Sequence, residues 1–115
     1  MIATLKSFAA ALFLGLALSC AASWAGWAQE FTLELTVENQ KFVPDELRAP
    51  ANRPIVIQIR NNGSVPMEFE SVSLRVEKVI AAKSRGSVRI RPLKPGRYEF
   101  LDDFHKETKG TLIVE

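Results

Sequence analysis

The stretch that decides the fold lies near the C-terminus and reads Tyr98-Glu99-Phe100-Leu101-Asp102-Asp103-Phe104-His105. Tyr98 and Phe100 alternate with Glu99, which is the period-two pattern of a strand with one buried face. The alternation then gives way to two adjacent carboxylates and the only histidine of the chain. Residues 106–110 are polar and residues 111–114 are apolar, which predicts a strand, a polar loop and a closing strand. Because carboxylate and imidazole donors together suit transition-metal ions, this loop is the first candidate for a metal site.

The first 28 residues have the composition of a secretory signal peptide. Lys6 is the only charge before Glu30, the apolar core at 8–18 is short, and small residues lead up to Ala28. A basic start, a short apolar centre and a small-residue cleavage site are typical of such signals. A membrane anchor would need about 20 apolar residues. We therefore predict cleavage after Ala28 and export of residues 29–115.

Cleavage leaves 87 residues, enough for one small domain at 29–115. This domain has 14 basic and 13 acidic residues and no basic run, which argues against nucleic acid as the partner. Cys20 is lost with the signal peptide, so the mature chain has no disulfide, thiolate ligand or thiol nucleophile. It also has no serine in a nucleophile turn and no glycine-rich phosphate loop. We expect no small-molecule substrate other than metal ions.

Short alternating segments, separated by turn residues, run through the rest of the domain. We predict strands at 31–37, 42–49 (an edge strand interrupted by Pro44), 55–60, 67–71, weakly within 72–80, and at 87–91, 98–101 and 111–114. No amphipathic helix is evident. Seven or eight short strands at regular spacing predict an all-β fold, a Greek-key β-sandwich.

A second acidic segment lies in the strand at 67–71. Strand alternation places Glu68 and Glu70 on one face, with Met67 and Phe69 on the other. An ordinary solvated strand face is the alternative, but like charges so close oppose each other unless a cation lies between them. Met67 is either core filler or a soft thioether ligand. Glu77 is explained more simply as part of a solvated edge.

Asp102, Asp103 and His105 also have an ordinary alternative role. Adjacent acids in a turn often only accept hydrogen bonds from backbone amides, and a lone surface histidine is usually solvated. Asp102 shares the inward parity of Phe100, and Asp103 shares the parity of His105. If the loop forms a metal site, the acidic strand at 67–71 must meet it at the same end of the sandwich.

The segment 61–114 resembles the cupredoxins, the small Greek-key blue-copper proteins. Residues 95–105 match their Pro-Gly-x-Tyr-x-Phe-x-Cys-x-x-His motif. The resemblance places Met67 at the position of the first histidine ligand. It places Asp102 at the position of the cysteine ligand and His105 at that of the second histidine. No methionine follows His105, so one of four blue-copper ligands remains and no type 1 blue copper centre is expected.

Two further segments, Glu68-Phe69-Glu70-Ser71 and Phe104-His105-Lys106-Glu107-Thr108, resemble the cupredoxin-like proteins of bacterial periplasmic ferrous-iron uptake systems. They are also similar to the cupredoxin domain of EfeO-type proteins. The resemblance implies a copper or iron ion, with these ligands: Glu68, Glu70, Asp103 and His105, and additionally Met67 and Asp102. It implies a role in ferrous-iron oxidation and uptake or in electron transfer. The implied partners are an inner-membrane iron permease and a periplasmic iron-binding protein. Two alternatives stay open, an accessory ferroxidase enzyme and a Greek-key interaction module of the cell envelope without a metal.

Overall fold

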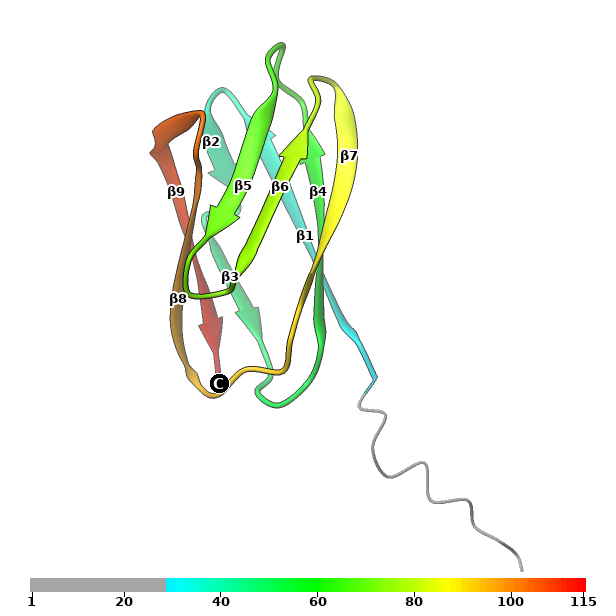
Figure 1. The fold of residues 1–115 in the computed structure, drawn as a ribbon, viewed down its shortest axis with the longest axis vertical. Coiled ribbons are helices and arrows are strands. Elements are labelled where there is room, and N and C mark those ends of the chain that lie inside the picture. Colours follow the sequence, from blue (N-terminus) through cyan, green and yellow to red (C-terminus); the bar gives the residue numbers. More distant parts are fainter. Residues whose placement is uncertain (1–28) are drawn as a thin grey trace, which may run out of the picture.

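The computed structural model describes residues 29–115, which form nine strands in two facing sheets (Figure 1). The strands are β1 (Phe31–Glu38), β2 (Lys41–Val43), β3 (Glu46–Ala49), β4 (Ile55–Asn61), β5 (Met67–Ser71), β6 (Val76–Ile80), β7 (Ser84–Ile90), β8 (Gly96–Asp102) and β9 (His105–Val114). One sheet has the order β2-β1-β4-β7 and the other the order β3-β9-β8-β5-β6. The predicted β-sandwich is confirmed. The predicted signal peptide lies outside the described residues, which contain no helix long and apolar enough to cross a membrane.

The expected single edge strand at 42–49 is in fact two strands in different sheets. β2 pairs with β1 in the four-stranded sheet, and β3 pairs in parallel with β9 in the five-stranded sheet. Pro44, which follows a cis peptide bond, has no N–H group to donate to either ladder, so it separates the two strands. The chain thereby crosses from one sheet to the other at their common edge, and the strand count is nine instead of seven or eight.

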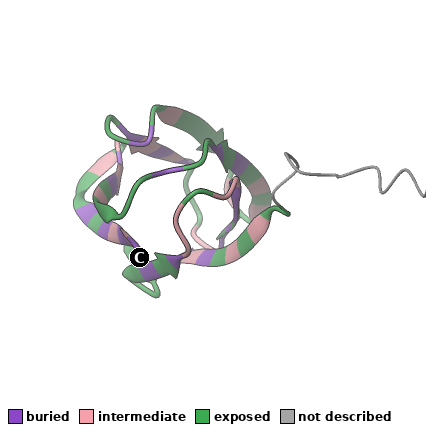
Figure 2. Cartoon of the chain, turned by 90° about the horizontal axis from the view of Figure 1, so that it is seen from below, coloured by how far each residue is buried: buried purple, intermediate pink, exposed green. Residues whose placement is uncertain are grey.

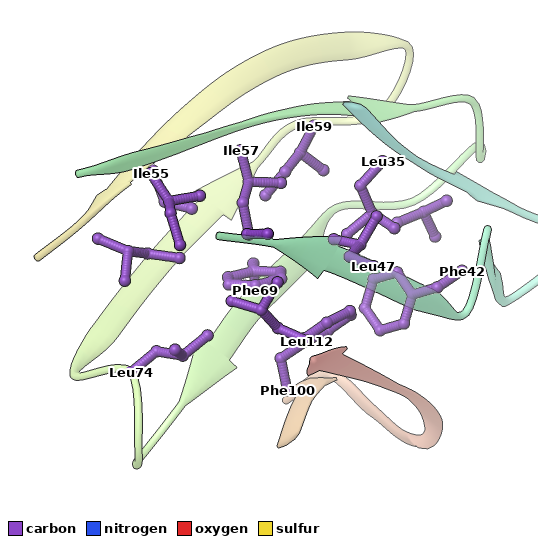
Figure 3. Packing of buried hydrophobic residues seen from close by; sticks show 14 of the residues in the cluster. Leu35, Phe42, Leu47, Ile55, Ile57, Ile59, Phe69, Leu74, Phe100 and Leu112 are labelled. Carbon is purple, nitrogen blue, oxygen red and sulfur yellow. The ribbon is translucent and has the colours of Figure 1, made fainter. Parts of the chain in front are cut away.

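The core lies between the two sheets, where each strand turns alternate side chains inward. Buried and exposed residues accordingly alternate along the strands when the sandwich is seen from below (Figure 2). Phe42, Phe69 and Phe100 form the centre of this core, with the ring centroid of Phe100 5.0 Å from each of the other two (Figure 3). Phe69 and Phe100 come from neighbouring strands of one sheet, whereas Phe42 reaches them from the other sheet. This aromatic cluster packs the two sheets against each other behind β5 and β8.

The prediction of a polar loop at 106–110 is also wrong, because β9 begins at His105 and includes these residues. From Glu107 onward the segment alternates as a strand should: Thr108 and Gly110 are buried, while Glu107 and Lys109 are exposed. The Thr108 hydroxyl donates a hydrogen bond to the carbonyl oxygen of Gln40 at 2.6 Å, which satisfies its buried polar group. The connection between β8 and β9 is therefore only a tight turn at residues 103–104, and this turn holds the acidic side chains in place.

Candidate metal site

The two acidic segments meet at one end of the sandwich, which we call the site pole. There β5 begins, β8 ends and β9 begins, at the top of Figure 1. The amide of Asp103 donates to the carbonyl oxygen of Glu68 at 2.8 Å. The amide of Glu68 in turn donates to Oδ1 of Asp102 at 3.0 Å. These reciprocal contacts fix the start of β5 against the turn at 103–104.

Asn61 organises the neighbouring loop at the same pole. Its side chain is 1% exposed, and Oδ1 accepts a hydrogen bond from the amide of Gly63 at 2.9 Å. Nδ2 donates to the carbonyl oxygens of Val65 at 2.9 Å and Ile80 at 3.2 Å. Asn61 thus ties the loop before β5 to the end of β6. An asparagine two residues before a glycine is a sequence signal of such an Asx turn.

We call three of the six predicted ligands, Asp102, His105 and Met67, the inner group; within it the Asp102 carboxylate contacts His105. The side chain of Asp102 is buried, and its Oδ1 accepts hydrogen bonds from the amides of Glu68 and Phe104, both at 3.0 Å. Its Oδ2 lies 2.8 Å from Nδ1 of His105. Met67 is 1% exposed and packs in the core. Both carboxylate oxygens of Asp102 are therefore engaged within the protein.

The other three predicted ligands form an outer cluster, on the outward face of the five-stranded sheet. Glu68, Glu70 and Asp103 are half-buried, and one carboxylate oxygen from each lies within 4.8 Å of the others. This grouping within residues 29–115 does not include His105. Glu77, which the sequence suggested was an ordinary edge residue, lies directly opposite Glu70 in the pairing of β5 with β6. The nearest counter-charge is Lys106, whose Nζ lies 3.7 Å from Oδ1 of Asp103.

Glu68 and Glu70 of the outer cluster hold protons more firmly than isolated glutamates do, because their pKa values are raised. Partial burial raises the pKa of Glu68 above its ordinary value of 4.5, and a hydrogen bond with Glu77 raises it further. A hydrogen bond with Asp103 is the main cause that raises the pKa of Glu70, followed by partial burial. The positive charge of Lys106 acts in the opposite direction on Glu70. A cation among these groups would offset their mutual repulsion when they are ionised.

Because these pKa values are raised in the folded state, the free energy of unfolding should depend on pH. The folded state holds the two protons more tightly than the unfolded chain, so the resulting stabilisation is complete below pH 4.5. It is lost as the pH rises through the higher pKa values of the folded state. The Glu68→Gln/Glu70→Gln variant lacks this loss, so without metal it should gain stability relative to the native protein as the pH rises. Guanidinium denaturation across that window measures the difference, and a difference that does not change with pH would contradict the prediction.

Comparison with known proteins gives the same fold. A family model described as "Cupredoxin-like domain" matches residues 8–114. Over 83 residues the chain is 36% identical to protein RP394 of Rickettsia prowazekii (strain Madrid E), a match that covers 71% of this chain and 66% of that protein. The chain thus spans just under two thirds of the length of this relative.

Among solved structures, auracyanin A, a "blue" copper protein from Chloroflexus aurantiacus, superposes with a TM-score of 0.65 at 15% identity, covering 76% of this chain and 100% of that one. The metal binding domain of the Cu(I)-exporting P-type ATPase CopA of Streptococcus pneumoniae, solved with Cu(I), gives a TM-score of 0.64 at 17% identity, covering 78% and 99%. Identities this low show a shared fold. The family model, however, matches nearly the whole chain, and the two-sheet sandwich agrees with it. The chain belongs to the cupredoxin-like domain family.

Proposed function

We propose that this protein is a periplasmic metal-binding member of its family, which takes copper or iron on the carboxylates of Glu68, Glu70 and Asp103. The observation that carries the proposal is the approach of these three groups, from two distant segments, to within 4.8 Å of one another. Oxygen donors of this kind suit iron ions and Cu(II) better than Cu(I), which prefers sulfur ligands. A bound ion of either metal would supply one-electron redox chemistry, while the carboxylates bind it and hold it at an accessible surface.

The proposal assigns the inner group a positioning role and includes no type 1 blue copper centre. The resemblance to cupredoxins places Asp102 and His105 at ligand positions, but here the two side chains bond to each other. The remaining oxygen of Asp102 accepts two amide hydrogen bonds, and residues 29–115 contain no cysteine to supply a thiolate. The Asp102–His105 pair therefore fixes the turn that carries Asp103, next to the start of β5 that carries Glu68.

The proposed setting is iron uptake or electron transfer, with an inner-membrane iron permease and a periplasmic iron-binding protein as partners. The Glu68-Phe69-Glu70 segment, with its likeness to the cupredoxin-like domains of ferrous-iron uptake systems, supports this setting. In the structure Phe69 is buried while both glutamates face outward, so one short strand joins the core to the proposed site. A metal held on the outward face would be within reach of a partner protein.

Metal titration tests the site. We expect the Glu70→Gln variant to bind Fe(II) or Cu(II) at least tenfold more weakly than the native protein, because even supporting residues of metal sites typically contribute about 10–100-fold. Glu99→Gln is the matched control, because Glu99 is an exposed acid on β8 of the same sheet and lies outside the cluster. Equilibrium dialysis followed by metal analysis gives the affinities. An equal loss in both variants would indicate nonspecific attraction and contradict the site.

Experiments on the same purified protein distinguish the two alternative functions, a ferroxidase and an interaction module without a metal. A ferroxidase would consume dioxygen repeatedly when Fe(II) is added, whereas a carrier would not. Failure to retain Cu(II), Fe(II) and Mn(II) would instead favour an interaction module without a metal.

A further inference from the structure

A second feature lies on the opposite sheet, away from the acidic cluster. The outward face of β1, β4 and β7 contains a groove with a volume of about 330 Å³. Six polar side chains line it in two rows that run across the three strands. Strand register places Thr36, Arg60 and Arg85 in one row and Glu34, Gln58 and Ser87 in the other. The proposed metal function does not account for this regular polar surface.

Arg60 and Arg85 are the two basic side chains that line the groove. They are directly opposite each other in the antiparallel pairing of β4 with β7, and both are exposed. Like charges in this position destabilise a sheet. Within residues 29–115 neither guanidinium lies within 4.0 Å of a carboxylate, whereas Arg89, two positions from Ser87 on the same face of β7, pairs with Glu30. An oxyanion between the two arginines would relieve the repulsion, because guanidinium groups match carboxylate and phosphate oxygens in charge and geometry.

Glu34 restricts what else the ligand can carry. It lies in the second row on β1, one strand and two residues from Arg60. Strand spacing and rise put their Cα atoms about 8 Å apart. A second negative group reaching that corner would be repelled, while a hydroxyl or ammonium group would be accepted. In the same row Gln58 lies next to Glu34 and Ser87 lies next to Gln58, and both side chains offer donors and acceptors.

We propose that this groove binds a small polar molecule through one oxyanion group, held by Arg60 and Arg85, with hydrogen-bond donors directed to Glu34. A phosphate monoester or a carboxylate with hydroxyl groups has this chemistry. The site is separate from the metal cluster, so the proposal does not depend on the proposed metal function.

NMR titration of the metal-free protein with inorganic phosphate, glycerol 3-phosphate and lactate tests the inference, and the latter two distinguish phosphate from carboxylate ligands. We expect saturable shifts in β4 and β7, with dissociation constants below roughly 10 mM for at least one organic probe. Arg85→Gln should weaken binding at least tenfold. Arg89→Gln removes the same charge from the same strand and should change affinity less than twofold. Glu34→Gln should strengthen binding of citrate, which carries several negative groups.

Two results would overturn the inference. One is that no probe causes saturable chemical-shift changes at concentrations up to roughly 10 mM. The other is equal weakening by the Arg85 and Arg89 substitutions, which would mean that a diffuse positive field attracts the anion. Since all of these side chains are exposed, the variants should fold, and their amide spectra verify this directly.

Discussion

Replacement of Asp102 by alanine is expected to lower the free energy of unfolding by about 3 kcal/mol, because each donor that loses its acceptor away from water typically costs about 1–3 kcal/mol. The carboxylate accepts hydrogen bonds from the amides of Glu68 and Phe104 and contacts the His105 ring. Alanine would leave both amides without their acceptor and the imidazole without its partner. Guanidinium denaturation measures the loss.

Two variants make this expectation specific. Asp102→Asn keeps one carbonyl oxygen for the amides and should cost about 1–2 kcal/mol. Asp103→Ala changes the neighbouring acid, which faces outward in the acidic cluster, and should change stability by no more than about 0.5 kcal/mol. If Asp102→Ala and Asp103→Ala had equal effects, the buried carboxylate would not be the element that fixes the site pole.

Gly110→Ala is expected to destabilise the protein by about 3 kcal/mol, the upper part of the usual range for an overfilled core. A Cβ atom at this position would lie 2.4 Å and 2.5 Å from two ring atoms of Phe100 and 3.0 Å from the carbonyl oxygen of Asp45. Phe100 has little freedom to move, because it is 2% exposed and packs against Phe42 and Phe69. Thermal or denaturant unfolding would show the effect.

Gly96→Ala is the matched control. Gly96 also lies in a strand of the five-stranded sheet, but its added Cβ would come no closer than 3.5 Å to the Tyr98 ring. We expect little loss there. A smaller side chain at position 100 should also lower the cost of the first substitution, so Phe100→Leu/Gly110→Ala should be more stable than the sum of the two single effects predicts. Equal losses at Gly96 and Gly110 would refute the packing argument.

The outline of the fold could be predicted because alternation is a local property of the chain. The inward parity of Asp102 and the shared face of Glu68 and Glu70 follow directly from it, and the structure has both. The polar residues at 106–110 led to the wrong prediction of a loop, because exposed lysines occur on the outer face of a strand as well as in loops. Composition alone does not distinguish these settings.

The details of the candidate site depend on contacts between distant segments, which sequence patterns do not contain. Glu77 joins the acidic surface only because β6 pairs with β5 in a register that sets it opposite Glu70. In the same way, His105 is three residues from Asp102, a spacing that permits either a shared metal or a direct hydrogen bond. The structure has the hydrogen bond, and the outer carboxylates lie together without the imidazole.

The parallel pairing of β3 with β9 has a consequence for how the chain folds. Glu46 is aligned with Thr111 and Ala49 with Val114, so within residues 29–115 β3 has β9 as its only neighbour in the sheet, although the two strands are far apart in the sequence. Sandwiches built from such distant pairings typically fold in about milliseconds to seconds, because long loops must close before the contacts form. A nascent chain that has not yet produced β9 therefore leaves β3 with no neighbour in its sheet, and cooperative folding has to wait for synthesis of that last strand.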